Sequence, residues 1–226
     1  MPDERIAIIF DVDGTLVDTN YFHAVAWWRA FQEIGEDVPM YKIHPLIGMG
    51  SDQLVHRLIG RESEEASERH SEHYEPFKKE IKAFPKASEL LEEVDRRGGR
   101  VVLATSSNEE DLERLREAVG ADDAIDEVVS KSDVEHSKPA PDIFEAALKK
   151  IGLDPERTLV VGDTPWDVEA AKKLGVQAVC VLTGGSPRED LEKEGAIAVY
   201  EDVADLLAHL DDSPIAQLLA KDASDT

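Results

Sequence analysis

Short apolar runs rich in β-branched residues alternate with amphipathic stretches along most of this 226-residue chain, and this alternation limits the fold more than any other feature. The runs predict strands at 6–10, 100–105, 127–130, 158–162, 177–182 and 197–200. Several of them, such as IAIIF and RVVLAT, are apolar on both faces, which is typical of a sheet covered by helices on both sides. The alternation therefore predicts a doubly wound, mostly parallel, Rossmann-like α/β sheet.

The stretches between the strands carry apolar residues at helical spacing. They predict helices at 86–97, 109–119, 142–151, 166–174 and 203–210. The fourth begins directly after Pro165, a residue well suited to the entrance of a helix. Beyond Leu210 we expect a short helix and a frayed tail.

The region from about 20 to 83 breaks this alternation, because it shows helical patterns and no convincing strand. Helices are expected at 21–34, 51–58 and 62–81, with Pro76 as a break or kink in the last of them. An inserted α-helical subdomain is the simplest interpretation. We therefore expect an α/β core at 1–18 and 84–210, a helical cap at 19–83 and a C-terminal tail at 211–226.

Acidic residues dominate the charge of the chain, with 49 Asp and Glu against 25 Lys and Arg and a formal net charge of -24. Such a surface repels nucleic acid and anionic membranes, so we expect neither as a partner. A phosphate site must then be built from local donors and a metal. The chain shows no run of ~20 apolar residues and no signal-peptide layout. Because Cys180 is the only cysteine, no intramolecular disulfide can form, and we expect a cytoplasmic location.

Two acids follow the first predicted strand. Asp11 and Asp13 come directly after IAIIF, and open α/β sheets bind ligands at the carboxyl ends of their strands. One carboxylate there can attack phosphorus and form an aspartyl phosphate, while the other can protonate the leaving group and then take a proton from water. Gly14 allows a tight turn that directs N–H groups at an anion. An ordinary turn rich in Asp and Gly is the alternative interpretation.

A hydroxyl cluster and a lysine form the second and third motifs. Thr105 and Ser106 follow a strand and can hold two phosphoryl oxygens; alternatively, Ser107 or Asn108 only caps the next helix, whose N-terminus is itself an anion site. Lys138, in SKPAPD, is placed to balance the charge of a phosphate and to keep the nucleophile ionised beside it. A surface lysine at an ordinary helix entry is the alternative.

The fourth motif, GDTPWD, again places acids after an apolar strand. Asp163 and Asp167 can complete an oxygen shell for Mg²⁺, which binds a few carboxylates and keeps several waters. For Asp167 the alternative is an acid in the first turn of a helix, where the helix dipole favours negative charge.

The order and spacing of the four motifs together resemble the haloacid dehalogenase superfamily. The resemblance rests on FDVDGTLVDT, LATSSN, SKPAPDIFEAAL and VVGDTPWDVEAAKKLG, and it covers the chain to about Leu210. The insertion after the first motif is similar to the helical cap of the branch that contains phosphoglycolate phosphatases and β-phosphoglucomutases.

The resemblance implies a role for each matching residue. Asp11 matches the nucleophile and a metal ligand, and Asp13 matches the general acid/base whose backbone carbonyl binds the metal. Thr105 matches a phosphate-binding hydroxyl, with Ser106 supplying a neighbouring N–H. Lys138 matches the catalytic lysine that bridges nucleophile and phosphate.

The remaining matches concern the metal and the reaction. Asp163 matches the last metal carboxylate, and Asp167 matches an acid that supports the metal waters or the lysine. Mg²⁺ is the implied cofactor. An acid at position 13 favours phosphate esters, because the related dehalogenases and phosphonatases usually lack a carboxylate there. We therefore expect a phosphatase for a small phosphorylated metabolite, with a β-phosphoglucomutase-like enzyme as the alternative and a non-catalytic binding protein on the same fold as a further one.

The loop at 44–52, between cap helices, is similar to the specificity loop of the superfamily. A plain helix–helix turn is the alternative. Nearby, Lys42, His44 and Arg57 are interpreted either as substrate contacts or as solvated surface residues. The sequence leaves the substrate and the oligomeric state open.

Overall fold

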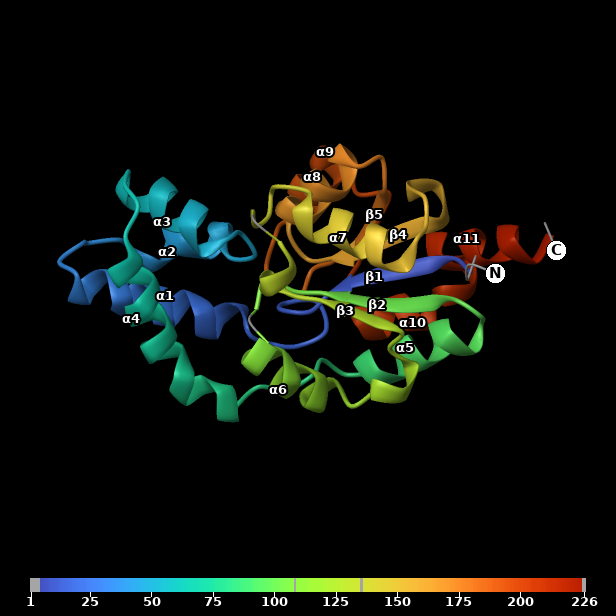
Figure 1. The fold of residues 1–226 in the computed structure, drawn as a ribbon, viewed down its shortest axis with the longest axis horizontal. Helices are drawn as coiled ribbons and strands as arrows, with labels where there is room; N and C mark the ends of the chain where they lie inside the picture. The colour runs from blue at the N-terminus through green and yellow to red at the C-terminus, as the bar shows by residue number, and fades with distance from the viewer. Residues whose placement is uncertain (1–4, 108, 135, 225–226) are drawn as a thin grey trace.

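The computed structural model describes residues 5–107, 109–134 and 136–224 and contains a six-stranded parallel sheet between two layers of helices, with a helical cap at one end (Figure 1). The strands are β1 (Ala7–Asp11), β2 (Arg100–Ala104), β3 (Glu127–Val129), β4 (Thr158–Gly162), β5 (Gln177–Val181) and β6 (Ala198–Tyr200). Their order is β3-β2-β1-β4-β5-β6, and each neighbouring pair is parallel. The predicted doubly wound α/β fold is confirmed, and each predicted strand agrees within one residue at either end.

Both faces of the sheet are buried, because side chains of a strand alternate between two hydrophobic cores. In β1, Ile8 and Phe10 belong to one core, whereas Ala7 and Ile9 belong to the other. The first core is covered by α5 (Ala87–Arg96), α6 (Glu109–Val119), α10 (Val203–Ala208) and α11 (Pro214–Ser224). The second is covered by α7 (Asp142–Ile151), α8 (Pro165–Lys173) and α9 (Arg188–Glu194).

Two helices of the core differ from the expectation. The pattern did not predict α9, whose only fully buried side chain is Leu191, because one apolar residue produces no helical periodicity. The short helix expected after Leu210 is present as α11, but it packs on the core and is not part of a tail. Its residues Ile215 and Leu218 pack into the first core, so this segment contributes to the fold of the sheet domain.

The cap contains α1 (Asn20–Glu33), α2 (Met40–Ile43), α3 (Ser51–Ile59) and α4 (Glu64–Tyr74), which surround a separate hydrophobic cluster. Trp27, Phe31 and Leu54 lie in that cluster. The break expected at Pro76 is confirmed, because α4 ends at Tyr74 and a 3-10 turn follows. Only α2, a single turn, was not predicted.

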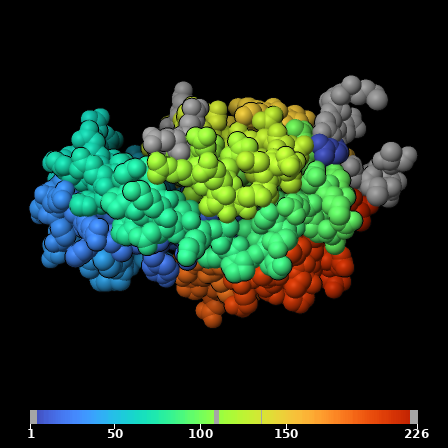
Figure 2. Space-filling model, turned by 90° about the horizontal axis from the view of Figure 1, so that it is seen from below, coloured from blue at the N-terminus to red at the C-terminus, as the bar shows by residue number. Residues whose placement is uncertain are grey.

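The chain enters and leaves the cap at one place. The N–H of Asp18 donates to the carbonyl of Lys82 at 3.0 Å, and the N–H of Phe84 donates to that of Leu16 at 2.9 Å. Two paired linkers therefore connect the cap to the core, and we propose that the cap comprises residues 19–83. In Figure 2 the cap, in blue to teal, lies directly against the core. Among the described residues, no helix combines the length and apolarity needed to cross a bilayer.

The sheet topology creates a crevice beneath the cap. From β1 the chain moves outward to β2 and β3, and then returns to place β4 on the other side of β1. Connections that diverge from two adjacent strands leave an open crevice at their carboxyl ends, where α/β proteins bind ligands. The four motifs meet at this edge.

Candidate active site

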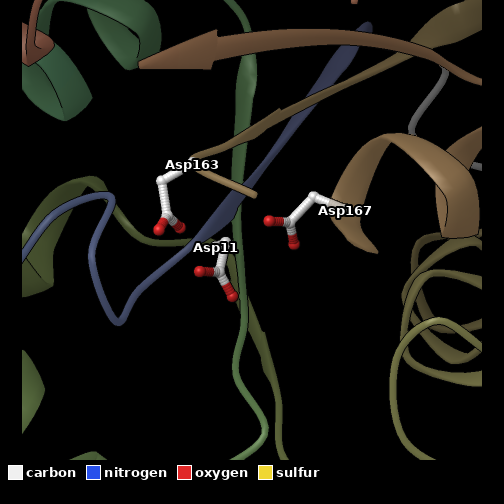
Figure 3. Close-up of side chains that lie close together, drawn as sticks. All are labelled: Asp11, Asp163 and Asp167. Atoms are coloured by element: carbon white, nitrogen blue, oxygen red, sulfur yellow. The ribbon is translucent and has the colours of Figure 1, made fainter. Parts of the chain in front are cut away.

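Three buried carboxylates converge at the carboxyl ends of β1 and β4 (Figure 3). Asp11 ends β1, Asp163 follows β4, and Asp167 lies in the first turn of α8. One oxygen from each carboxylate lies within 4.8 Å of the others. Three like charges at this separation, removed from water, need cations to balance them. The arrangement fits a divalent metal held by oxygen ligands.

Lys138 supplies one of those cations. Its side chain is 1% exposed, and its Nζ donates to Asp11 Oδ1 and, at 2.7 Å, to Asp167 Oδ1. The interpretation of Lys138 as a surface lysine is therefore wrong. Burial disfavours the ammonium, but the two carboxylates outweigh burial and raise the pKa of Lys138 above its usual value. The lysine is a fixed positive charge beside Asp11.

Asp167 acts as both a helix cap and a support for the lysine. While Oδ1 accepts from Lys138, Oδ2 accepts from the hydroxyl of Thr164 at 2.6 Å and from its N–H at 3.1 Å. The interpretation of Asp167 as an acid in the first turn of a helix is therefore confirmed, and the same side chain also contacts Lys138. Because both of its oxygens already accept hydrogen bonds, Asp167 is better suited to orient Lys138 than to bind a metal directly.

Burial dominates the protonation of the other two carboxyls. It raises the pKa of Asp11 to about 7 against the opposing pull of Lys138. The pKa of Asp163 is raised well above its ordinary value by burial first, and then by the charges of Asp167 and Asp11. A bound divalent cation would reverse both shifts, so these residues fit Mg²⁺ as the family resemblance implies.

The surroundings of Asp13 lower its pKa, in contrast to those of Asp11 and Asp163. Its Oδ1 accepts from Thr19 Oγ1 at 2.7 Å and lies 3.6 Å from His23 Nε2. Its Oδ2 accepts from Ser107 Oγ at 3.0 Å and Thr105 Oγ1 at 3.2 Å. Burial alone would raise the pKa of Asp13, but His23 and the hydroxyl donors lower it to about 2. The carboxyl is therefore ionised at neutral pH in this arrangement.

The hydroxyl loop lies at the end of β2. Thr105 is fully buried, and its Oγ1 accepts the N–H of Ser107 at 3.0 Å. Ser106 lines the cavity above Asp11, and no group of the described residues engages its N–H. Ser107 directs its hydroxyl to Asp13, while Asn108, the other expected helix cap, lies outside the described residues. Thr105 and Ser106 are thus brought to the same site as the acids.

Gly14 forms the expected tight turn but does not offer its own N–H to an anion. Its N–H donates to the carbonyl of Val17 at 2.8 Å, so it is not available to a phosphate, and that part of the prediction is corrected. The residue has φ of +78°, and a Cβ there would lie 2.3 Å from Asn20 Nδ2 and 2.5 Å from Asp163 Oδ2. Glycine is required by the turn and by close packing against the acids.

A cavity of about 250 Å³ separates these groups from the cap. The cap loop predicted to set specificity docks on the lysine segment: the Gly50 N–H donates to the carbonyl of Lys138 at 3.1 Å, and Gln53 Nε2 donates to that of Ser137 at 3.0 Å. On the opposite wall, His23 and Tyr74 line the cavity. The cap therefore closes over the site.

The three charged cap residues considered from the sequence face elsewhere. His44 Nε2 lies 3.0 Å from the carbonyl of Gly184, and Arg57 lies 4.9 Å above the ring of Trp166, while Lys42 is exposed. In the part of the chain that is described, none of the three lines the cavity. The contacts of His44 and Arg57 hold the cap to the core.

Sequence reasoning missed four residues that contact the acids. Thr15, Thr19, Asn20 and His23 lie within ten residues after Asp13 in the chain, and they bond to Asp13 or Asp163 or lie beside Asp13. The only available signal was their clustering directly after DVDG. Their polar types alone do not distinguish a contact from a helix start.

Comparisons with known proteins agree with this geometry. A family model described as haloacid dehalogenase-like hydrolase matches residues 8–181. A phosphoglycolate phosphatase from Rhodospirillum rubrum is 32% identical over 216 residues, covering 88% of each chain. Pyrophosphatase PpaX from Bacillus velezensis is 30% identical over 219 residues, covering 92% of this chain and 97% of the other. The crystal structure of a hydrolase from Pseudomonas syringae is 38% identical, with a TM-score of 0.86, and covers 92% and 99% of the two chains.

Proposed function

Because the chain belongs to the haloacid dehalogenase-like hydrolase family, we propose that it is a Mg²⁺-dependent phosphatase that forms an aspartyl phosphate on Asp11. The observation that carries this proposal is that Asp11, Asp13 and Lys138 line one cavity, while a carboxylate oxygen of Asp163 lies within 4.8 Å of one of Asp11. The expected substrate is a small phosphorylated metabolite, since the cavity measures only about 250 Å³. The single cysteine, Cys180, is buried and free, which supports a reducing, cytoplasmic location.

Three groups of this chain would hold the metal: the carboxylates of Asp11 and Asp163 and the backbone carbonyl of Asp13. Asp167 would act indirectly, by fixing Lys138. When bound, Mg²⁺ neutralises charge on the phosphoryl oxygens and orients the group for in-line attack.

Phosphoryl transfer then follows from the positions of the side chains. A carboxylate oxygen of Asp11 attacks phosphorus, and the bond from phosphorus to the leaving oxygen breaks. Lys138 and the Thr105 hydroxyl stabilise the charge on the phosphoryl oxygens, together with the free N–H of Ser106. Asp13 gives its proton to the leaving alkoxide. Water next attacks phosphorus and gives a proton to Asp13, so that the Asp11 carboxylate and inorganic phosphate are released.

The protonation of Asp13 depends on the substrate in this scheme. In the ligand-free protein, His23 and the hydroxyls of Thr19 and Ser107 lower its pKa. Its Oδ2 accepts from the hydroxyls of Ser107 and Thr105. A phosphate dianion that takes over these hydroxyls removes the donors and adds nearby negative charge, and both changes raise the pKa of Asp13. Substrate binding thereby converts this residue from a base into an acid.

Hydrolysis of p-nitrophenyl phosphate with and without Mg²⁺ tests the proposal, with Asp11→Asn beside the wild type. Uncatalysed hydrolysis of phosphate monoesters is so slow that acceleration of up to ~10²¹-fold is known, so even weak turnover stands clear of background. Mg²⁺-dependent turnover in the wild type alone is expected. Equal rates in the two proteins would reject Asp11 as the nucleophile.

A sugar-phosphate mutase is the second candidate. The docking of Gly50 on Lys138 favours it, because a mutase needs a cap that excludes water while the substrate turns over. With β-glucose 1-phosphate, a phosphatase releases inorganic phosphate, whereas a mutase produces glucose 6-phosphate. A panel of phosphorylated metabolites that includes phosphoglycolate and pyrophosphate then identifies the substrate.

A further inference from the structure

The proposed metal carboxylate Asp163 is held from two sides. Its Oδ1 accepts from Thr15 Oγ1 at 2.9 Å, and its Oδ2 accepts from Asn20 Nδ2 at 2.9 Å. Thr15 belongs to the core, but Asn20 is the first residue of α1 and therefore of the cap. All three side chains are buried. A residue of the cap thus fixes one half of a carboxylate that belongs to the core.

The orientation of the Asn20 amide follows from its neighbours. Its Nδ2 faces Asp163 Oδ2 and lies 3.5 Å from the carbonyl of Gly184. The carbonyl only accepts hydrogen bonds, and so does Asp163 as the ionised metal ligand, so the nitrogen, not the oxygen, must face them. Asn20 is 2% exposed, and its Oδ1 finds no donor among the described residues. A buried carbonyl oxygen without a partner is unusual and calls for an explanation.

Two glycines enclose the Asn20–Asp163 pair. A Cβ at Gly14 would lie 2.3 Å from Asn20 Nδ2, and one at Gly184 would lie 1.8 Å from Asp163 Oδ2. The backbone at both glycines therefore packs closely against the pair, and this packing restricts rotation of the two side chains. The unpartnered Oδ1 is a fixed acceptor beside the proposed metal ligand.

We propose that Asn20 is a positioning residue for the metal, which orients Asp163 through its N–H and accepts a hydrogen bond from a metal-bound water through Oδ1. Mg²⁺ retains several of its waters when bound to protein, and these supply the missing donor. The inference rests on the proposed function, since it takes Mg²⁺ as the ion. The preceding residue, Thr19, binds Asp13, so the first turn of the cap reaches both sides of the site.

Calorimetric titration of the whole chain with Mg²⁺ alone tests this inference. The proteins compared are the wild type, Asn20→Ala, Asn20→Ser and the control Asp18→Asn. Asp18 lies in the same linker, but its side chain is exposed. Loss of an outer-shell partner weakens metal binding by about 10–100-fold, so we expect at least tenfold weakening for Asn20→Ala and the wild-type Kd for Asp18→Asn. The serine hydroxyl is too short to reach Asp163, so Asn20→Ser is also expected to bind more weakly.

Thermal unfolding in EDTA separates lost binding from lost folding. An unchanged Kd in a folded Asn20 variant overturns the inference, and Asn20→Ser decides by the same criterion if Asn20→Ala does not fold. A wild type that binds no Mg²⁺ would instead remove the metal from the proposed function. Failure of the inference and failure of the proposed function are therefore distinguishable.

Discussion

The acidic cluster of the core and the aromatic cluster of the cap face each other across the cavity. Charged interactions stabilise the first cluster, whereas stacking of rings stabilises the second. In the core, Asp11, Asp163 and Lys138 are buried charges joined by ion pairs and hydrogen bonds. In the cap, His70 lies between stacked rings, 4.1 Å from Trp27 and 5.4 Å from His23 between centroids. Burial, with a smaller contribution from nearby side chains such as Lys131, lowers the pKa of His70 well below its usual value, so this ring is neutral.

From this difference we expect the core cluster to carry out phosphoryl transfer and the cap cluster to select the substrate. Phosphoryl transfer needs fixed charges in a site of low dielectric, where they act strongly on the transition state. The rest of the substrate needs only a surface of suitable shape, and neutral rings provide one at little electrostatic cost. The clusters meet at one contact, between His23 of the cap and Asp13 of the core. Substitutions of the core acids and of Lys138 should therefore change kcat, and those of the cap rings should mainly change KM.

The largest effect is expected for Asp11→Asn. Loss of the nucleophile should lower kcat by about 10⁴-fold or more, since residues that act as a unit fail together. Thermal stability in EDTA should not fall at pH 8, because the raised pKa of Asp11 means that its charge is disfavoured in the folded protein. Steady-state kinetics and a thermal melt measure both. A destabilised, still active variant would make Asp11 a structural residue and break the comparison.

Lys138→Met should affect both rate and stability. Methionine fills a similar volume but leaves Asp11 and Asp167 buried without their cation. Breaking a buried pair costs about 3–5 kcal/mol, and loss of the phosphate counter-charge should reduce kcat by about 10²–10³-fold. Urea unfolding and kinetics measure these losses. The control Lys149→Met removes an exposed i,i+4 pair with Glu145 and should change neither.

The pH dependence of metal binding comes next in size. The folded-state pKa of Asp11, about 7, exceeds its ordinary value near 3.9, so the metal-free folded protein binds the extra proton and loses stability as pH rises from ~4 to ~7. Asp163 shifts in the same direction. Mg²⁺ competes with these protons, so the rise in Tm on adding Mg²⁺ should grow with pH and level off above about 7.

Melts with and without Mg²⁺ between pH 5.5 and 8.5 measure this dependence. Asp13 does not contribute to this dependence. Its pKa is lowered to about 2, so its stabilising effect is lost only at pH values below that range. In Asp11→Asn the dependence should become shallower. A Mg²⁺ effect on Tm that is constant across the range would contradict the electrostatic description of the core cluster.

The core cluster was also the more predictable of the two from sequence. Asp11 and Asp163 lie at the ends of strands, and parallel strands bring their carboxyl ends to one edge whatever the details of packing. The strand bounds were predicted accurately because a short run that is apolar on both faces fits a strand in a sheet covered on both sides, and few other structures. Lys138 alone was ambiguous, because burial of a lysine depends on partners that lie far apart in the chain.

The contacts made by the cap were not predictable because they depend on how α1 leaves the core. Asn20 and Thr19 reach Asp163 and Asp13 only because the linkers at Asp18 and Lys82 pair and fix the direction of the helix. Polar residues at a helix start are common, so their types contain no signal for this contact. The same holds for α9, where one buried leucine cannot define a period.

The smallest effect is expected for His70→Phe in the cap. Phenylalanine preserves the stack on Trp27 but removes the hydrogen bond between His70 Nε2 and His23 Nδ1, which is 3.2 Å long. A net hydrogen bond contributes about 0.5–1.5 kcal/mol, so kcat/KM for the identified substrate should fall by about two- to tenfold, mostly through KM. The control His56→Phe alters an exposed histidine of the cap outside the cavity and should leave both constants unchanged. If His70→Phe instead lowered kcat as strongly as Lys138→Met, or shifted the Mg²⁺ requirement, the cap rings would belong to the catalytic machinery, and the division between the charged core cluster and the cap rings would fail.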